Sequence, residues 1–393
     1  MKTIRCILKE GKEKPLEGYH PWIFSGAIDE IDDSFKPGDL VKVFSSQNRF
    51  LGIGYLNPRS QIAVRMLTFE DVSIDQAFFE KRVRNAVALR HQFVLNSETN
   101  ACRLIHAEGD FLPGLIVDLY ADYLVAQILT AGMERWREMI IGILQKELSP
   151  KGIFEKGDSE GREWEGLEKR IGRLAGEEPP DFVEIQENGL QFIVDIHRGQ
   201  KTGFFIDQRA NRRIAGSLAR GKRVLNCFSY TGGFSVYAAK GGATQTVSVD
   251  SSEPALNTAR VHFEKNGLKP EDHTFEEADV FEYLRQTRQE FDMIILDPPA
   301  FCQNKNQIQQ AARGYKDINL FAFKRLAPGG LLFTFSCSSH IEPDLFQKIV
   351  FGAAKDARRE VRILAKTGHA MDHPVSIYHP EGEYLKGLLC EAA

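Results

Sequence analysis

Apolar and polar residues alternate with different periods in successive stretches of the chain. Between residues 3 and 70, short runs with a period of two are separated by turn clusters such as KPGD at residues 36–39. This pattern is typical of short, half-buried strands and predicts a compact β-barrel. The expected strands are residues 4–8, 40–44, 50–55 and 62–67.

A helix is expected to follow the barrel and to link two domains. Asp75 is a suitable N-cap, and Phe79, Val83, Val87 and Val94 recur on one helical face up to about residue 95.

The middle of the chain, to residue 187, predicts a small α+β domain with the order strand, strand, helix, strand, strand. A charged segment at residues 157–180 is expected to be a loop that is mobile or faces a ligand. Asn188-Gly189 predicts a hairpin turn after it. The other expected elements are strands at 115–120, 123–129, 153–155 and 182–186, and a helix at 133–148.

After the hairpin, strands and helices alternate. Repeated βα units with short turns imply a parallel, doubly wound (Rossmann-like) α/β sheet whose ligands sit beyond the carboxyl ends of the strands. The expected strands are 224–228, a run ending at 250, 274–277, 291–296, 331–335, 361–364 and 384–390. The patterns together predict three domains, at residues 1–74, 75–187 and 188–393.

Composition narrows the class of protein. The net charge of −4 gives no global basic field, which counts mildly against a nucleic-acid partner, although a local basic surface would suffice. The six cysteines are scattered without metal-ligand or disulfide spacing, so we expect no metal and a reducing cytoplasm. No apolar run approaches the roughly 20 residues that a membrane span requires.

The stretch 223–250 predicts a nucleotide-binding crossover. A strand leads into Tyr230-Thr231-Gly232-Gly233, a helix follows, and the next strand ends on Asp250, whose carboxylate suits a ribose diol. The turn is not G-x-G-x-x-G, so no dinucleotide site is indicated. A shorter loop suits S-adenosylmethionine (SAM), which has a ribose and an adenine but no phosphate. The alternative is an unliganded crossover.

Polar groups follow several strands of the expected sheet. Asp250, Asp279, Asp297 and Cys337 all fall at carboxyl ends, where a ligand is expected. Pro298 holds Asp297 out of the helical region, so its carboxylate is presented to a ligand. The polar loop 199–209 either caps the next helix or meets a ligand, and ligand contact is favoured.

Cys337 is the candidate nucleophile. It lies in a small, hydroxyl-rich turn, where the backbone N–H groups of Ser338 and Ser339, leading towards the next helix, would favour a thiolate. A thiolate that adds to C6 of cytosine makes C5 nucleophilic enough to accept a methyl group. Asp297 would stabilise the charge that develops on the ring.

Two alternatives remain open. An N-methyltransferase acting on guanine or adenine could use the Asp-Pro-Pro motif with Phe301 and would need no thiol. An idle RNA-binding assembly factor would keep SAM only as a structural ligand.

The chain resembles the three-domain ribosomal RNA large-subunit methyltransferases of the "I" type, which make 5-methylcytosine. The resemblance covers almost the whole length and is carried by residues 20–26, 112–118, 199–209, 226–234, 296–301 and 336–340. It implies an N-terminal PUA domain, a central α+β domain and a C-terminal class I SAM methyltransferase. It also implies a cytosine in 23S rRNA as the target, with Cys337 as the nucleophile.

The same resemblance implies which residues line the SAM pocket: Phe228, Thr231, Gly232, Asp250, Asp279 and Asp297, with Lys201, Thr202, Phe204 and Gln208 nearby. Their neighbours Tyr230, Ser251 and Val280 are also expected to bind SAM. The chain departs from the wider group of RNA cytosine-C5 methyltransferases, which carry a second cysteine after the Asp-strand proline. Pro299-Ala300 occupies that slot, so the group that takes the C5 proton is open among His340, Asp297 and water.

The sequence leaves three further points open. They are the nucleotide modified, the choice between naked rRNA and a partly assembled subunit, and the oligomeric state, for which a homodimer is one alternative. Aromatic residues 20–26 could stack bases, but Trp22 and Phe24 are expected to fill a core.

Overall fold

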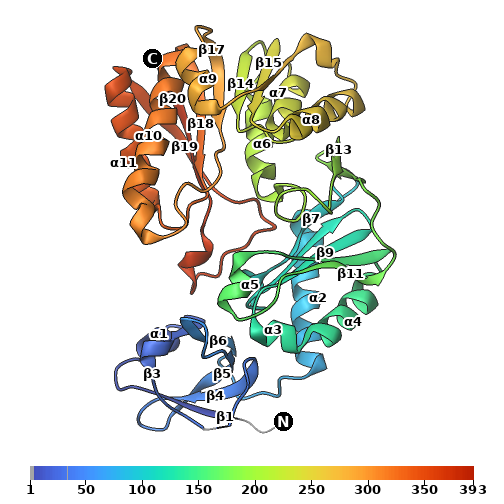
Figure 1. Ribbon diagram of the computed structural model, residues 1–393, viewed down its shortest axis with the longest axis vertical. Helices are drawn as coiled ribbons and strands as arrows, with labels where there is room; N and C mark the ends of the chain where they lie inside the picture. The colour runs from blue at the N-terminus through green and yellow to red at the C-terminus, as the bar shows by residue number, and fades with distance from the viewer. Residues whose placement is uncertain (1–3, 33) are drawn as a thin grey trace. The chain divides into compact units, whose positions relative to one another are not determined.

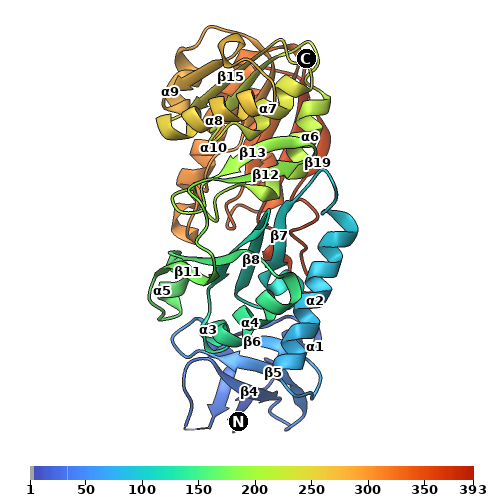
Figure 2. The same cartoon turned by 90° about the vertical axis from the view of Figure 1, so that its right-hand side faces the viewer.

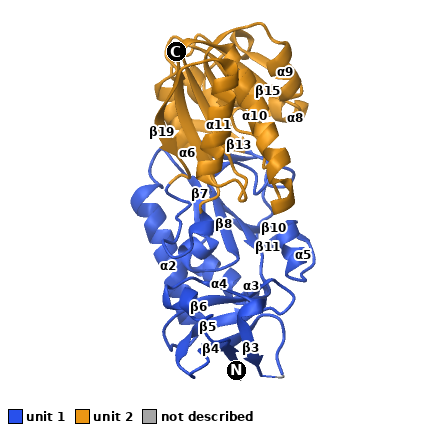
Figure 3. Ribbon diagram, turned by 90° about the vertical axis from the view of Figure 1, so that its left-hand side faces the viewer, with its two compact units in different colours: residues 1–186, 194–206, 371–382 blue, residues 187–193, 207–370, 383–393 orange. Residues whose placement is uncertain are grey.

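A computed structural model describes residues 4–32 and 34–393, so residues 1–3 and 33 of the first predicted domain lie outside the described residues. The chain forms two compact units (Figures 1 and 3). Unit 1 contains residues 1–186, 194–206 and 371–382, and unit 2 contains residues 187–193, 207–370 and 383–393. The predicted division into three domains stays a prediction. Two later segments of the chain are part of the unit that holds its N-terminal half.

The first sheet of unit 1 is the expected small barrel. Its six strands have the order β2-β6-β5-β4-β1-β3, and β1 pairs in parallel with β4. Inward-facing residues such as Cys6, Val41 and Val43 build its core. The strands are β1 (Ile4–Leu8), β2 (Trp22–Phe24), β3 (Ile28–Ile31), β4 (Asp39–Phe44), β5 (Phe50–Leu56) and β6 (Ile62–Thr68), with a short helix α1 (Lys14–Glu17).

Strand β2 was not among the expected strands, and it pairs antiparallel with β6. The prediction that Phe24 fills a core is wrong, because the residue is 51% exposed. Trp22 is half-buried, and its Nε1 donates to Glu108 Oε1 at 2.8 Å. A three-residue strand has only one inward position, and Ile23 takes it.

The helix predicted after the barrel is confirmed as α2 (Gln76–Phe93). The Asp75 side chain accepts from the Phe78 N–H and so caps the helix, while Phe79 and Val83 are fully buried. The next sheet has the order β11-β10-β9-β8-β7. Its strands are β7 (Ala101–His106), β8 (Leu115–Tyr120), β9 (Tyr123–Ile128), β10 (Gly152–Gly157) and β11 (Arg170–Gly176).

Two expectations for this region are wrong. The single helix 133–148 is two helices, α3 (Ala131–Arg135) and α4 (Arg137–Leu148), separated at Trp136. The segment 157–180 is not a loop, because it contains α5 (Glu160–Trp164) and β11, which pairs with β10. Its charges do not keep it in solvent, since the buried Arg162 contacts Glu134 Oε2 at 3.1 Å.

The Asn-Gly hairpin is confirmed between β12 (Val183–Glu187) and β13 (Leu190–Val194). Asn188 and Gly189 both adopt the left-handed conformation that this turn requires.

Unit 2 is a doubly wound sheet with the order β16-β15-β14-β17-β18-β20-β19 (Figures 1 and 2). Successive strand residues face opposite layers of helices. Leu225 and Ile294 pack in the cluster that includes α10 and α11, whereas Val224 and Ile295 pack with α6 and α7. Burial of both faces explains why these strands are continuous apolar runs.

The strands of unit 2 are β14 (Arg223–Cys227), β15 (Gln245–Asp250), β16 (Thr274–Glu277), β17 (Phe291–Leu296), β18 (Leu326–Ser336), β19 (Val361–Thr367) and β20 (Lys386–Ala392). Its helices are α6 (Arg209–Ser217), α7 (Gly233–Lys240), α8 (Glu253–Lys265), α9 (Val280–Gln286), α10 (Ile308–Arg325) and α11 (Pro343–Ala357).

Six of the seven strands of this sheet run in one direction, and the expectation of a parallel sheet fails at β20. Strand β20 lies between β18 and β19 and is antiparallel to both. A terminal strand can enter next to β18 in this direction without a crossover helix.

Candidate active site in unit 2

The turn after β14 is held by the acid at the end of β15. Asp250 accepts the Tyr230 N–H at 2.8 Å and the Ser252 N–H at 3.0 Å, one on each carboxylate oxygen. Phe228 and Tyr230 have positive φ angles, so the turn is tightly wound. A carboxylate has about four acceptor positions, so Asp250 can also accept from a diol. Ser251 beside it is exposed.

Gly232 gives this turn its close approach to α8. Its φ is +74°, and a Cβ there would lie 2.7 Å from the Ala259 Cβ. We therefore expect Gly232→Ala to cost about 1–2 kcal/mol in stability and to weaken SAM binding, which calorimetry would measure. Gly267→Ala is the matched control, because its φ is +67° but nothing lies within 4 Å of the added Cβ. Equal SAM affinities for the two variants would contradict this account.

The His262 side chain on α8 holds the same turn through a backbone contact and also contacts the backbone of Ile193. Its Nδ1 lies 2.7 Å from the Thr231 carbonyl oxygen, and its Nε2 accepts from the Ile193 N–H at 3.0 Å. Burial lowers the pKa of His262 to about 4, below its ordinary value of 6.5. The folded protein therefore holds a neutral imidazole at neutral pH.

This histidine predicts a pH dependence of stability. Between about pH 6.5 and pH 4 the unfolded chain takes up a proton that the folded protein does not, so stability falls as the pH falls through that window. The expected loss is about 1.4 kcal/mol per pH unit. Urea unfolding followed by circular dichroism should show this slope in the wild type and not in His262→Gln. Parallel curves for the two proteins would contradict it.

Phe228 belongs to an aromatic group beside the turn. Its ring centroid lies 6.4 Å from that of Phe281 and 6.3 Å from that of Phe301. The Asp279 carboxylate caps α9 by accepting the Glu282 N–H at 3.0 Å, and Val280 is buried at the start of that helix. Asp279 thus has a structural task whether or not it also touches a ligand.

Gln208 and Asp297 are brought together at the end of β17. The Gln208 Nε2 donates to Asp297 Oδ1 at 2.8 Å. Asn211 donates to Gln208 Oε1 at 2.6 Å, which fixes the orientation of the buried amide. The amide therefore holds the half-buried carboxylate in one position.

Cys337 follows β18 directly and is half-buried. Its Sγ lies 3.7 Å from the carbonyl oxygen of Pro298, so the thiol and the Asp297-Pro298 turn are adjacent. Ser338 and Ser339 lie in the turn that leads to α11, which begins at Pro343. The Ser338 N–H donates to Ser336 Oγ at 3.4 Å.

Lys386 was missed by the sequence reasoning. It lies opposite Ser336 in the β18–β20 pair, and its Nζ donates to Ser338 O at 2.7 Å and to Tyr384 O at 2.8 Å. Burial lowers the pKa of this ammonium, and the charge of the neighbouring Cys337 acts in the opposite direction. A lysine within the apolar run LKGLLC was the available signal.

Three predicted SAM contacts fall in unit 1. Thr202 Oγ1 donates to Asp118 Oδ2 at 2.6 Å, the Phe204 N–H donates to Tyr120 Oη at 3.2 Å, and Lys201 Nζ lies 4.8 Å from the Phe205 ring centroid. Their role in SAM binding stays a prediction.

The residues around the turn between β14 and α7 fit SAM. Asp250 can accept from a ribose diol, the Phe228 group offers an apolar face for an adenine, and Gly232 keeps the turn free of a side chain. The Ser229 hydroxyl is buried without a hydrogen-bond partner among the described residues. Within the same residues, no three His, Cys, Asp or Glu side chains are placed to hold a metal ion, and no helix is long and apolar enough to cross a membrane.

Fold and site together define a SAM-dependent methyltransferase with an appended β-barrel, as expected. A profile of S-adenosylmethionine-dependent methyltransferases matches residues 165–365, and a profile of PUA-like domains matches residues 6–69. A solved structure of a candidate methyltransferase with SAH bound matches with a TM-score of 0.86 and 27% identity, over 99% of this chain and 100% of the other.

Curated relatives narrow the class. Ribosomal RNA large subunit methyltransferase I of Photobacterium profundum is 47% identical over 99% of both chains. Its counterpart in Shewanella denitrificans is 48% identical over 98% of this chain and 99% of its own. The chain belongs to the ribosomal RNA large subunit methyltransferase I family.

Proposed function

We propose that the protein methylates C5 of a cytosine in 23S rRNA through a covalent adduct between Cys337 and C6 of the base. The observation that carries the proposal is the half-buried Cys337 thiol, 3.7 Å from the turn that presents Asp297. The relatives named for the large-subunit RNA support an rRNA substrate, which would be met in the cytoplasm.

The proposed chemistry needs an enzyme nucleophile, because C5 of cytosine is by itself too weak a nucleophile to accept the methyl group. Cys337 Sγ loses its proton and adds to C6, which places a pair of electrons on C5. SAM supplies an electrophilic methyl group for that carbon. Removal of the C5 proton then restores the double bond and expels the Cys337 thiolate, so that the enzyme returns to its starting state.

Asp297 is the proposed partner of the base. Its carboxylate is held by Gln208 at 2.8 Å, and it would stabilise charge on the pyrimidine ring during the addition. We infer that Cys302 does not take the place of the second cysteine that the wider group of RNA cytosine-C5 methyltransferases carries. It is buried, and its Sγ donates to Asn304 O at 3.2 Å. Asp297, His340 and water stay the three alternatives for taking the C5 proton.

Lys386 is proposed to favour the Cys337 thiolate by its charge. Lys386→Met should therefore move the rising limb of the pH–rate profile to higher pH and lower the rate at pH 7 about tenfold for each unit moved. Lys386→Arg keeps the charge and should restore part of the rate. Single-turnover rates from pH 6 to pH 10 would measure this. A uniform loss with an unmoved profile would leave Lys386 only a structural role.

The proposal is tested most directly by mapping 5-methylcytosine in rRNA from cells that lack the protein. One cytosine of 23S rRNA should lose its methyl group and regain it on complementation with the wild type. A lost N-methyl group on guanine or adenine would instead favour the Asp-Pro-Pro alternative. An unchanged rRNA would favour an idle assembly factor.

Single-turnover transfer from labelled SAM to naked 23S rRNA, compared with assembled large subunits, would identify the substrate form. The homodimer stays a prediction.

A further inference from the structure

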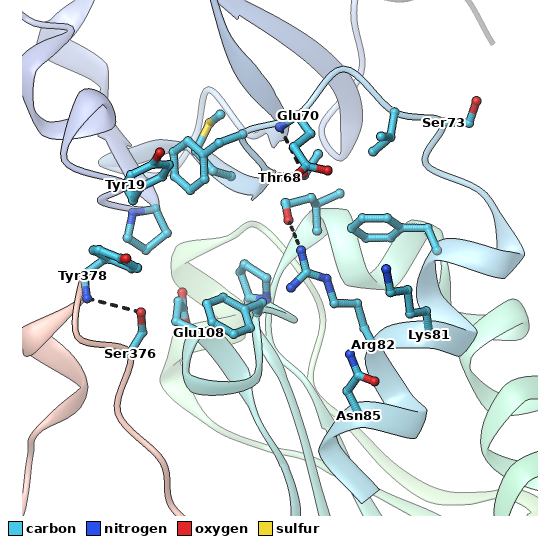
Figure 4. Close-up of a pocket in the computed structure, with 18 of the residues that line it drawn as sticks. Tyr19, Thr68, Glu70, Ser73, Lys81, Arg82, Asn85, Glu108, Ser376 and Tyr378 are labelled. Atoms are coloured by element: carbon cyan, nitrogen blue, oxygen red, sulfur yellow. Dashed lines mark hydrogen bonds between the residues drawn. The ribbon is translucent and has the colours of Figure 1, made fainter. Parts of the chain in front are cut away.

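A cavity apart from the predicted methyl-transfer site lies wholly within unit 1. It has a volume of about 760 Å³, and Figure 4 shows Tyr19 and Tyr378 on one side and Lys81, Arg82 and Asn85 of α2 on the other. This volume is within the range of small-ligand sites. None of the residues predicted for the methyl-transfer site lines it.

Three aromatic rings that line this cavity are half-exposed. Tyr19 is 51% exposed, Phe111 is 49% exposed and Tyr378 is 47% exposed. Tyr19 and Phe111 also hold positive φ angles of 61° and 58°, which are strained for such side chains. Tyr19 and Tyr378 also contact one another, with ring centroids 5.2 Å apart. The half of each ring that stays exposed is suited to contact with a flat ligand.

The two cations of α2 that line the cavity, Lys81 and Arg82, are not held by ion pairs in the part of the chain that the structure describes. Arg82 packs its guanidinium 5.2 Å from the Phe78 ring centroid and 5.1 Å from the Phe111 ring centroid, and donates to Leu67 O at 3.2 Å. Among the described residues it forms no ion pair, and the side chains of Lys81 and Asn85 have no hydrogen-bond or ion-pair partner. A guanidinium has five N–H donors, so several of them can bind an anion.

The carboxylates at the cavity do not cancel these charges. Glu108 accepts from Trp22 Nε1 at 2.8 Å and from Arg65 at 3.0 Å. Asp75 caps α2 by accepting the Phe78 N–H at 3.0 Å. Glu70 is the third lining acid, and its charge acts on Arg82. Lys81 and Arg82 are therefore opposed at the cavity by one carboxylate that is held neither by a cation nor at a helix N-terminus.

We propose that this cavity binds one unpaired nucleotide of an RNA strand, with its base against the exposed rings and its phosphate at Arg82 and Lys81. A base inside a duplex is stacked on both faces and cannot enter a concave site, so the nucleotide must be unpaired. The inference rests on the proposed RNA substrate and adds a binding site outside the methyl-transfer site. It would anchor a segment of the RNA other than the methylated base.

Fluorescence anisotropy of the full chain with a labelled ten-nucleotide, pyrimidine-rich single-stranded RNA tests the proposal. Arg82→Gln and Tyr378→Leu should each raise the Kd about tenfold. Arg82→Gln should also lower the slope of log Kd against log salt by about 0.7. Arg84→Gln is the matched control, because Arg84 is on the same helix but pairs with Glu80 and Glu147. It should bind RNA as the wild type does.

Photocrosslinking gives a second readout that does not depend on a folded variant. RNA carrying 5-iodouridine should crosslink the wild type at Tyr19, Phe111 or Tyr378, as found by mass spectrometry of the peptides. A fully paired RNA hairpin should give none of these crosslinks.

The outcomes separate this inference from the proposed function. Wild-type RNA affinity in both cavity variants, or crosslinks only elsewhere, would overturn the inference. Methylation of rRNA by the wild type would still support the proposed function. Weaker RNA binding by the cavity variants but not by Arg84→Gln would support the inference, even if the wild type transferred no methyl group to rRNA.

Discussion

Replacing Cys337 with alanine is expected to lower the rate of methyl transfer to 23S rRNA at least about a thousandfold, while SAM binding stays intact. The proposed route has no other group to add to C6, and a thousandfold loss corresponds to about 4 kcal/mol of transition-state stabilisation. SAM binding should persist because the thiol lies at the end of β18, whereas Asp250 and Gly232 belong to the first crossover. Single-turnover rates and calorimetry with SAM would measure the two quantities.

A matched control variant and an RNA that captures the covalent adduct complete this experiment. Cys302→Ser changes a buried thiol on the neighbouring loop and should retain activity. RNA containing 5-fluorocytidine should form a denaturation-resistant adduct with the wild type, because fluorine at C5 blocks the release step, and none with Cys337→Ala. Near-normal activity of Cys337→Ala would exclude the covalent route and favour methylation of a ring or amino nitrogen.

Replacing Asp110 with asparagine is expected to destabilise unit 1 by about 3–5 kcal/mol. Arg90 is 0% exposed, and its two Nη atoms donate to the two Asp110 oxygens at 2.6 and 2.7 Å. The His106 N–H donates to the same carboxylate at 2.6 Å. Asparagine removes the compensating charge and turns an N–H donor towards other donors, so the Arg90 cation stays buried without its partner.

Tryptophan fluorescence during urea unfolding would measure this loss, because the three tryptophans, Trp22, Trp136 and Trp164, all lie in unit 1. The control is Asp122→Asn. Asp122 pairs with Lys151 at 2.6 Å, but the two side chains are 59% and 57% exposed. Water and salt screen such a pair, so the midpoint should hardly move. Similar midpoints for the two variants would show that the Arg90–Asp110 pair contributes little.

Local patterns predicted most of the elements. Strands β1, β16 and β17 begin and end where the alternation placed them, and Asp75 caps α2. These features depend on residues within a few positions of one another, as strand periodicity and capping do. The fold class and the dependence on SAM were therefore open to prediction from the sequence.

Pairings between residues that are distant in the chain could not be predicted from the sequence. The charged segment 157–180 looked like a loop because its partners, such as Glu134 for Arg162, come from another part of the chain. Phe24 looked like a core residue because its exposure depends on which face of a three-residue strand points inward.

The sequence by itself determined the barrel, three strands of the α+β sheet (β8, β9 and β10), the doubly wound sheet and the polar residues at its strand ends. Only the tertiary structure decided that β20 enters antiparallel beside β18 and brings Lys386 to the turn that holds Cys337. The two residues are far apart in the chain, and their meeting depends on strand order and register. A local apolar pattern records which side chains are buried, but it does not record which strand will be the neighbour.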